Sequence, residues 1–339
     1  MKAAIMHEVG KPLHIKEVPV PEIGPDEVLV ETRTCGICGP DLHILKGYGY
    51  VPALPHILGH EPAGVVAKVG ANVTHLHPGD RVVPNLFFTC DRCYYCRVGR
   101  HQQCVNLKGL LGVLCHGAFA EYFKAPGANL FPLPDHVPFD VGGLIADAVV
   151  TSVHAVKRAN LHLQDTAVVI GAGGIGQVLI QILKAAGVRV VGTARSEEKL
   201  HLARQLGADL VLKAGDPKAA ATAREFSGTD GVQCVFDCVG TAQTMRDGAD
   251  YAMRGGRIVV IGEEPAFPAV DTTEIAQREL EIIGSRNGTK QDTLEAIRLV
   301  AAGVVKPPIA RRFSLDEINQ AFDFVRQGTP ARVVVVVRE

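Results

Sequence analysis

From Thr166 onward the sequence alternates short apolar runs with helical stretches, and this alternation restricts the fold more than any other feature. Helical stretches such as "GQVLIQILKAAG" and "SEEKLHLARQLG" end at a glycine. The apolar runs between them are "TAVVIG", "VRVVGT", "DLVL", "VQCVFD", "RIVVIG" and "LEIIG". Alternation of this kind is typical of a parallel sheet with helices on both faces. The sequence therefore predicts an α/β domain with a doubly wound, six-stranded parallel sheet.

A glycine motif, "GAGGIG", follows the first of these strands and opens the first helix. In a dinucleotide site, the first glycine permits a tight turn, the second lets the backbone approach a pyrophosphate, and the third lets helix and strand pack closely. The phosphates would lie at the helix N-terminus. A glycine-rich turn without a ligand is the alternative, which the surrounding alternation disfavours. The predicted cofactor-binding residues are Gly171, Gly173, Gly174, Ile175 and Gly176.

The end of the second strand in this region bears on the choice of cofactor. An NAD site usually has an acidic residue there, about 20 residues after the motif, which binds the ribose 2′-hydroxyl. Here the segment reads "VVGTARSEEKL", with no carboxylate before Glu197. Arg195, with Ser196 beside it, suits a 2′-phosphate instead. We expect a preference for NADP(H), with NAD(H) possible; the alternative is a solvated arginine in an NAD(H) site.

The first ~150 residues have a different pattern of apolar and polar residues. Short β-like runs such as "EVLVETRTC" and "DRVVPN" are separated by turn signals such as "GPDE" and "HPGD", which predicts a β-rich domain with long loops. The length of 339 residues suggests about two domains. The chain therefore combines a β-rich domain with a nucleotide-binding domain.

Composition excludes several classes of partner. The 35 basic and 36 acidic residues give a formal charge of −1, which argues against nucleic acid or an anionic membrane surface. We find no apolar run of the roughly 20 residues needed to cross a bilayer, and the start "MKAAIMHEVG" does not read as a signal peptide. A cytoplasmic location is expected, so the nine cysteines need a reason other than disulfides.

Four of these cysteines lie in "CDRCYYCRVGRHQQC", with the spacing C-x2-C-x2-C-x7-C. Four thiolates can close a tetrahedral zinc site that has no open position, and such sites are structural. An iron–sulfur cluster also takes four thiolates, and unligated thiols are the third possibility. We predict a structural zinc ion bound by Cys90, Cys93, Cys96 and Cys104.

The stretch "TCGICGPDLH" offers a second set of reactive groups. A redox pair of Cys35 and Cys38 is conceivable, but nothing nearby reads as a thioredoxin-type βαβ unit. His60 follows in "GHEPAG", and Asp147 in "LIADAVV". Thiolate, imidazole and carboxylate are ligands of open, catalytic zinc sites. From these residues alone, a core cysteine, a buried histidine and a loop aspartate remain an alternative.

Taken together, these motifs resemble the zinc-dependent alcohol dehydrogenases of the medium-chain dehydrogenase/reductase superfamily. The resemblance covers essentially the whole chain and includes "CGICGPDLH", "GHEPAG", "PGDRV", the four cysteines, "GAGGIG" and "RGGRIVVIG" in the family's order. It implies a GroES-like catalytic domain built from residues 1–148 and 287–339, with a structural zinc lobe at about 90–104. A Rossmann domain at 149–286 would be inserted between them.

The resemblance also assigns roles at the catalytic zinc. It implies that Cys38, His60 and Asp147 are the ligands, Asp147 being a variant that the family shows. Glu61 would be a nearby carboxylate that can enter the coordination shell when water leaves. Asp41 would orient His60, a support that metal-bound imidazoles generally need.

Further roles concern the cofactor and the assembly. Thr151 would lie at the nicotinamide and Arg332 at the pyrophosphate. The two separate ligand sets, which differ in chemistry, predict two zinc ions per chain. The resemblance also implies a homodimer or homotetramer in which "RGGRIVVIG" and the segment after it join two sheets edge to edge.

Pro40 departs from the family pattern, which usually has serine or threonine at this position. That hydroxyl begins a proton relay that ends at a histidine like His43, and proline has none. Either a water fills the gap, or the substrate needs no relay. The expected reaction is hydride transfer between the nicotinamide and a small alcohol or carbonyl substrate, which the sequence does not name. The alternatives are reduction of an imine or activated alkene, and a nucleotide-binding protein without turnover.

Overall fold

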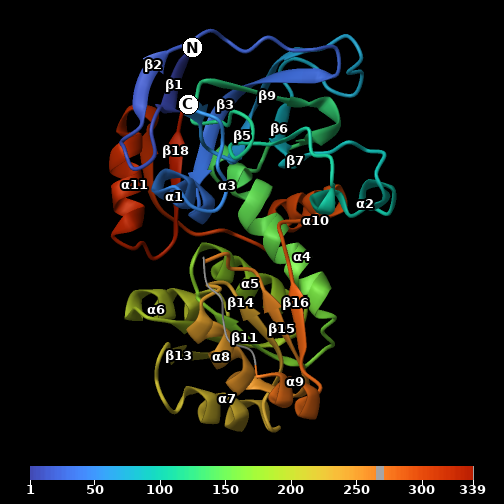
Figure 1. The fold of residues 1–339 in the computed structure, drawn as a ribbon, viewed down its shortest axis with the longest axis vertical. Helices are drawn as coiled ribbons and strands as arrows, with labels where there is room; N and C mark the ends of the chain where they lie inside the picture. Colours follow the sequence, from blue (N-terminus) through green and yellow to red (C-terminus); the bar gives the residue numbers. More distant parts are fainter. Residues whose placement is uncertain (265–270, 339) are drawn as a thin grey trace. The chain divides into compact units, whose positions relative to one another are not determined.

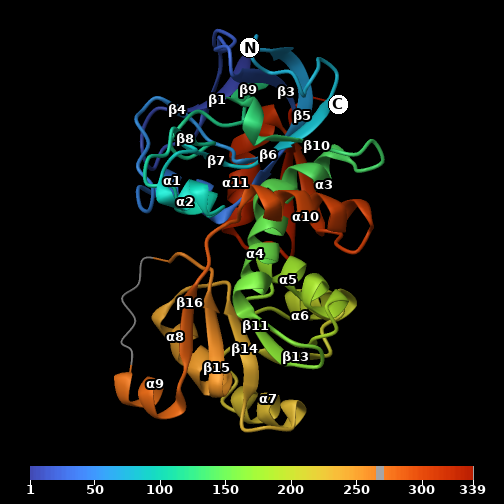
Figure 2. The ribbon, with the colours of Figure 1, turned by 90° about the vertical axis from the view of Figure 1, so that its right-hand side faces the viewer.

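The computed structural model describes residues 1–264 and 271–338, which form two compact units (Figures 1 and 2). Unit 1 comprises Met1–Val150, Gly288–Gly303 and Ile309–Glu339, and unit 2 comprises Thr151–Asn287 and Val304–Pro308. The predicted domain limits are 148 and 286. The structure adds one feature, the short return of residues 304–308 to unit 2.

Unit 2 contains a six-stranded parallel sheet in the order β13-β12-β11-β14-β15-β16. This is the strand order of a Rossmann fold, and all six predicted strands are confirmed. The edge strand beyond "RGGRIVVIG" is β16, so the quoted strand itself lies one position inside the sheet. The strands are β11 (Thr166–Ile170), β12 (Arg189–Ala194), β13 (Leu210–Lys213), β14 (Val232–Asp237), β15 (Ala252–Val260) and β16 (Glu281–Gly284).

Helices cover both faces of this sheet because alternate residues of each buried strand point to opposite sides. In β11, Ala167 and Val169 pack with α4, α5 and α6, whereas Val168 and Ile170 pack with α7 and α8. The two predicted helices are present as α5 and α6. The helices are α4 (Val150–Ala159), α5 (Gly174–Ala185), α6 (Glu197–Gln205), α7 (Ala219–Ser227), α8 (Ala242–Tyr251) and α9 (Thr272–Arg278).

Unit 1 is built on a seven-stranded sheet in the order β10-β6-β5-β3-β18-β17, with β9 also pairing with β3. The late strand β18 runs antiparallel to the end of β3, with Val333 opposite Ile37 and Val336 opposite Thr34. Segments from both ends of the sequence therefore form one sheet, as the resemblance implied. The strands are β3 (Glu27–Ile37), β5 (Glu61–Val69), β6 (Arg81–Pro84), β9 (Tyr122–Pro126), β10 (Leu130–Pro132), β17 (Ile309–Ser314) and β18 (Arg332–Val336).

Smaller elements complete unit 1. A three-stranded sheet has the order β2-β1-β4, and β7 pairs with β8. These strands are β1 (Lys2–Met6), β2 (His14–Glu17), β4 (His56–Ile57), β7 (Phe87–Phe88) and β8 (Gly109–Leu110). The helices are α1 (Gly39–Lys46), α2 (Tyr94–Arg97), α3 (Phe139–Leu144), α10 (Lys290–Ala301) and α11 (Ile318–Arg326).

One helical run corrects an expectation. Helix α3, a π-helical turn at Ile145–Val149 and α4 form a continuous run, Phe139–Ala159, that is long and apolar enough to cross a membrane. Most of this run is buried inside the protein, which is typical of a core helix. The sequence analysis missed the length of this helical run because Asp140 and Asp147 interrupt the series of apolar residues but do not interrupt the helix.

Candidate functional site

The first candidate centre lies in unit 1, where β3 ends and α1 begins. Cys38 occupies the N-cap position of α1, and the side chain of Asp41 accepts a hydrogen bond from the Cys38 backbone N–H at 3.0 Å. Pro40 lies in the first turn of this helix, where a missing N–H costs nothing because that group has no intrahelical partner. Pro40 thus has a local role: it starts the helix that carries His43.

Four side chains converge beside this helix start. Cys38, His60, Glu61 and Asp147 each offer one ligand atom, and these atoms all lie within 4.8 Å of one another. Oδ2 of Asp147 is 3.2 Å from Sγ of Cys38 and 3.7 Å from Nε2 of His60. A tetrahedral zinc ion with ordinary bond lengths separates such atoms by about 3.4–3.6 Å. Nε2 of His60 is buried without a hydrogen-bond partner. The donor set and this nitrogen fit a zinc ion.

Asp41 holds the imidazole of His60 in place. Its buried carboxylate contacts Nδ1 of His60 at 3.2 Å and also accepts from the Gly59 N–H at 3.2 Å. Because Nδ1 is engaged, Nε2 is the nitrogen left for a metal. Burial lowers the pKa of His60, but Asp41 and contacts with Asp147 and Cys38 outweigh it, so the pKa lies well above its usual value. A metal would therefore displace a proton on binding here.

Arg332 joins this centre, which the sequence analysis did not predict. It is the first residue of β18, and the pairing of β18 with β3 brings it to Cys38. Its guanidinium donates to Sγ of Cys38 at 3.3 Å and forms an ion pair with Glu61, which is fully buried. A buried guanidinium balances the negative charge of the surrounding ligands. The contact of Arg332 with a pyrophosphate stays a prediction.

His43 lies on α1, half-buried, with its ring against Tyr48 at a centroid distance of 4.6 Å. It is not one of the four residues whose ligand atoms converge. Its relay role stays a prediction. Cys35, the other half of the possible redox pair, is fully buried in the core of unit 1, and burial raises the pKa of its thiol well above the usual value. A thiol of that kind is unreactive.

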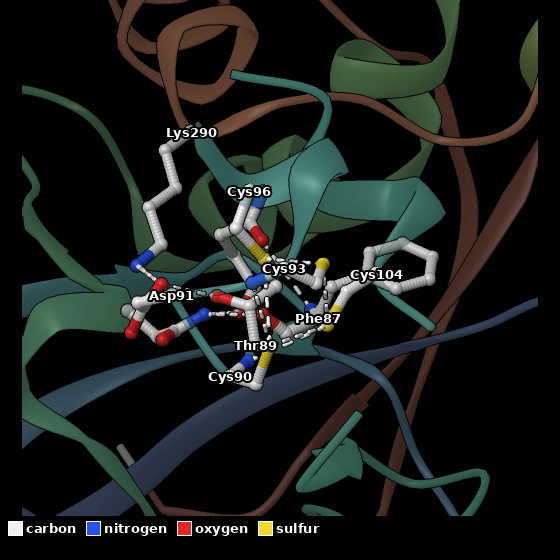
Figure 3. A network of polar contacts seen from close by, with 10 residues as sticks. Phe87, Thr89, Cys90, Asp91, Cys93, Cys96, Cys104 and Lys290 are labelled. Carbon is white, nitrogen blue, oxygen red and sulfur yellow. Dashed lines mark hydrogen bonds and ion pairs between the residues drawn. The ribbon is translucent and has the colours of Figure 1, made fainter. Parts of the chain in front are cut away.

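The second candidate centre is the four-cysteine lobe, residues 90–104 (Figure 3). The sulfur–sulfur distances are 3.5 Å for Cys93–Cys96, 3.6 Å for Cys90–Cys104, 3.9 Å for Cys93–Cys104 and 4.0 Å for Cys90–Cys96. Sulfurs at 2.3 Å from a tetrahedral zinc ion lie about 3.8 Å apart, whereas a disulfide needs about 2.0 Å. All four thiols are free, and their geometry fits zinc.

The backbone of this lobe stabilises thiolates. Hydrogen bonds from the backbone N–H groups of Cys96 and Val105 lower the pKa of Cys93 to about 6. The N–H of Cys93 also donates to Sγ of Cys90 at 3.4 Å. Because zinc binds the thiolate form, these amides favour metal binding.

An ion pair ties the lobe to α10. Nζ of Lys290, at the start of that helix, lies 3.7 Å from Oδ1 of Asp91, and the hydroxyl of Thr89 donates to the same oxygen at 2.6 Å (Figure 3). Asp91 has a φ of +56°, which is unusual for a residue with a side chain. The lobe is therefore anchored to the body of unit 1.

The glycine motif of unit 2 leaves room for a phosphate. Gly171 follows β11 with a φ of +88°, a conformation that favours glycine. A Cβ on Gly176 would lie 2.2 Å from the carbonyl oxygen of Gly171, whereas a Cβ on Gly173 would meet no atom within 4 Å. Open space at Gly173, beside the N-terminus of α5, fits a dinucleotide pyrophosphate. Gly174 and Ile175 form the first turn of that helix.

Two cations lie beyond the end of β12. Arg195 is exposed directly after the strand, and Ser196 caps α6, its hydroxyl accepting from the Lys199 N–H at 3.4 Å. Burial lowers the pKa of Lys199, and the charge of Arg195 lowers it further, so the two cations are neighbours. The sequence analysis missed Lys199, which lies in the first turn of α6.

Thr151, the residue expected at the nicotinamide, is buried at the start of α4. Nδ2 of Asn287, which follows β16, lies 3.5 Å from its hydroxyl. This contact joins Thr151 to the carboxyl end of the sheet in unit 2. Its role at the nicotinamide stays a prediction.

Comparisons with known proteins agree with this arrangement. The alcohol dehydrogenase GroES-like domain matches residues 24–135, and the zinc-binding dehydrogenase family matches residues 174–302. An alcohol dehydrogenase of Geobacillus stearothermophilus is 36% identical over 340 residues, which cover 99% of this chain and 100% of that relative.

Solved structures extend the likeness to three dimensions. An NAD-dependent alcohol dehydrogenase matches with a TM-score of 0.93 and 30% identity over 100% of both chains. A zinc-binding dehydrogenase of Sinorhizobium meliloti 1021, bound to NADP, matches with a TM-score of 0.87 and 31% identity over 99% of both chains. The chain therefore belongs to the zinc-dependent alcohol dehydrogenases of the medium-chain dehydrogenase/reductase superfamily, and it is an oxidoreductase that interconverts alcohols and carbonyl compounds with a nicotinamide cofactor.

Proposed function

We propose that this enzyme transfers a hydride between NADP(H), in preference to NAD(H), and a small alcohol or carbonyl compound at a zinc ion held by Cys38, His60 and Asp147. The observation that carries this proposal is the convergence of the three ligand atoms with a buried imidazole nitrogen that has no hydrogen-bond partner. A thiolate, an imidazole and a carboxylate leave a fourth position open for a substrate oxygen.

The protein prepares this centre in several ways. When bound, zinc would act as a Lewis acid on the substrate oxygen and lower the pKa of an alcohol hydroxyl. Asp41 fixes the imidazole of His60 through Nδ1. The fully buried Glu61, paired with Arg332, adds a carboxylate next to the ligands. Burial of these groups keeps water away, which strengthens their electrostatic effect on the substrate.

The proton of the alcohol needs a route to solvent. Position 40 is a proline and offers no hydroxyl. We therefore assign the last step of the relay, the transfer of the proton to solvent, to His43, whose imidazole lies half-buried one turn further along α1 and can both accept and donate a proton. A water would take the place of the missing hydroxyl.

The remaining parts of the proposal concern cofactor, second metal and location. The neighbouring charges of Arg195 and Lys199 favour a cofactor with a 2′-phosphate. The four-cysteine lobe would bind the second of two zinc ions per chain, and this zinc ion would have a structural role. None of the nine cysteines forms a disulfide, which supports a reducing, cytoplasmic location.

Reduction of an imine or alkene and a non-catalytic role are not favoured, because a curated relative and a solved structure that both match over nearly the whole chain are alcohol dehydrogenases. The test is a panel of alcohols and aldehydes with NAD+ and NADP+ in parallel, together with zinc analysis of each preparation. We expect turnover with NADP+ to exceed that with NAD+. His60→Ala should abolish turnover, whereas His77→Ala, at an exposed histidine, should not. Full turnover of His60→Ala would contradict the proposal.

A further inference from the structure

The imidazole of His43, to which the last step of the proton relay is assigned, needs a fixed ring plane. An imidazole passes a proton on by accepting it at one nitrogen and donating from the other, so each nitrogen must face its own partner. The χ2 torsion of histidine has broad minima, so the backbone of α1 alone does not set the plane of this ring. A neighbouring group must therefore hold the ring.

Tyr48 is such a neighbour, and it lies in the same unit of the structure as His43. The centroids of the two rings are 4.6 Å apart, and the ring planes are inclined by 31°. The rings therefore stack with a moderate tilt, at a distance that favours aromatic pairs. Both residues are half-buried, so the stacked pair is partly accessible to solvent.

The end of α1 places Tyr48 against His43. Gly47 follows the helix in a left-handed conformation, with a φ of +82°, and its N–H donates to the carbonyl of Ile44 at 3.0 Å. The chain turns back at this point, and the N–H of Tyr48 donates to the carbonyl of His43 at 3.1 Å. A Cβ on Gly47 would lie 2.6 Å from Cγ1 of Val9, so both the conformation and the packing favour glycine. The position of Tyr48 is thus set by the turn.

Glycines leave the edge of the imidazole uncovered. A Cβ on Gly39 would lie 3.9 Å from Cε1 of His43, and a Cβ on Gly49 would lie 3.8 Å from Cβ of His43. Cε1 lies between the two ring nitrogens, so the lack of a side chain at Gly39 leaves space beside them for a water. In this part of the chain, Tyr48 holds the face of the ring while the glycines leave its edge open.

We propose that Tyr48 is a positioning residue of the proton relay, whose ring holds the imidazole of His43 in the plane that passes the alcohol proton to solvent. The inference rests on the proposed function, to which the relay through His43 belongs. In the reaction, the carbinol carbon gives its hydride to the nicotinamide, and the hydroxyl proton passes by way of water and His43 to solvent. Tyr48 gains and loses neither a proton nor an electron. Its ring is therefore required, and its hydroxyl is not.

Kinetics of a set of variants test this inference. The rate of NADPH formation in a single turnover is measured with NADP+ and the alcohol of the panel that has the highest kcat/KM. The variants are Tyr48→Phe, which keeps the ring, Tyr48→Leu, which removes it, His43→Ala, and the double variant of Tyr48→Leu with His43→Ala. Tyr48→Met is a second variant without a ring, for use if Tyr48→Leu does not fold. Tyr122→Leu is the matched control, because Tyr122 is a half-buried tyrosine on β9 whose ring contacts the Arg338 guanidinium.

The stacking itself has a readout that does not depend on activity. An aromatic ring shifts the NMR signal of a proton that lies against its face. The Cε1–H signal of His43, assigned from its loss in His43→Ala, should therefore keep its position in Tyr48→Phe and move in Tyr48→Leu. An unmoved signal in Tyr48→Leu would show that the rings do not stack in solution and would overturn the inference.

We expect Tyr48→Leu to lower the turnover rate about 2- to 10-fold, with the KM for NADP+ and the zinc content unchanged. Tyr48→Phe and Tyr122→Leu should keep the wild-type rate. In the His43→Ala background, Tyr48→Leu should have no further effect, because Tyr48 acts through His43.

Three results would overturn the inference and leave the proposed function intact. They are a wild-type rate in Tyr48→Leu while His43→Ala is slow, an equal loss in Tyr48→Phe and Tyr48→Leu, and an undiminished effect of Tyr48→Leu in the His43→Ala background. A wild-type rate in His43→Ala would instead show that the relay in the proposed function is wrong, and the inference with it.

Discussion

Replacing Asp41 by asparagine tests how the catalytic centre is held together. The carboxylate is fully buried and serves three donors: Oδ2 accepts from the Cys38 N–H at 3.0 Å, and Oδ1 lies 3.2 Å from both the Gly59 N–H and Nδ1 of His60. Asparagine has nearly the same shape but only one acceptor oxygen. Its NH₂ group must therefore face a donor on one side.

The expected losses of stability and metal affinity follow from the number of donors that lose their acceptor. If the amide oxygen takes the place of Oδ1, the Cys38 N–H is left buried without an acceptor, which costs about 1–3 kcal/mol of folding free energy. If the amide turns over, two donors lose their acceptor and the imidazole of His60 is no longer fixed. Loss of such a support for a metal-binding histidine typically costs 10- to 100-fold in metal affinity. We expect Asp41→Asn to lose both stability and zinc.

The assay is competition for zinc against a chelator of known affinity, combined with chemical unfolding of the metal-free and metal-loaded protein. Asp80→Asn is the matched control, because the carboxylate of Asp80 accepts one backbone hydrogen bond, from His77, in an exposed turn. Metal affinity within twofold of wild type in Asp41→Asn, with the four-cysteine lobe still loaded, would refute the reasoning. It would show that the ligands alone set the geometry.

Four further predictions follow. Cys93→Ser should release one zinc ion and lower thermal stability. The control Cys115→Ser, at a free cysteine outside the lobe, should do neither. An unchanged melting temperature of Cys93→Ser would show that the lobe is not a structural zinc site. Arg195→Ala should raise the KM for NADP+ about 10- to 100-fold and barely change the KM for NAD+. Equal changes in the two KM values would show that Arg195 does not bind a 2′-phosphate. Pro40→Thr should speed alcohol oxidation near neutral pH, and His43→Ala should slow this reaction and shift its pH profile. If neither substitution changes the rate of alcohol oxidation, the relay is excluded. The edge strand β16 should join two sheets in a homodimer or homotetramer, so a sedimentation mass near 36.1 kDa at micromolar concentration would contradict this assembly.

The fold of unit 2 could be predicted because strands buried on both faces read as apolar runs. The limits of the elements were less certain: β15 begins at Ala252, ahead of the predicted run, because Gly255 and Gly256 conceal the start of a strand. The helical run at 139–159 was missed for a related reason, since Asp147 points to a ligand site from inside a buried helix. The local pattern of apolar and polar residues reflects which positions are buried. A polar functional residue that is buried does not follow this pattern.

The candidate site was predictable to the extent that its residues are close in sequence. The spacing of the four cysteines predicts their convergence, because short gaps leave the chain few ways to separate the thiols. Arg332 is the opposite case. It lies 294 residues from Cys38, and only the pairing of β18 with β3 brings the two together. No local pattern encodes that pairing.

This same pairing has a consequence for the order of events while the chain is being made. At translation rates of 5–20 residues per second, the 294 residues that separate Cys38 from Arg332 take about 15–60 s to synthesise. During that time β3 has emerged from the ribosome without the strand that completes its sheet. The first and last cysteines of the lobe are only 14 residues apart, so this segment can take up zinc early. We therefore expect the lobe to acquire its metal during synthesis, and the catalytic centre to acquire its own only after strand β18 has left the ribosome.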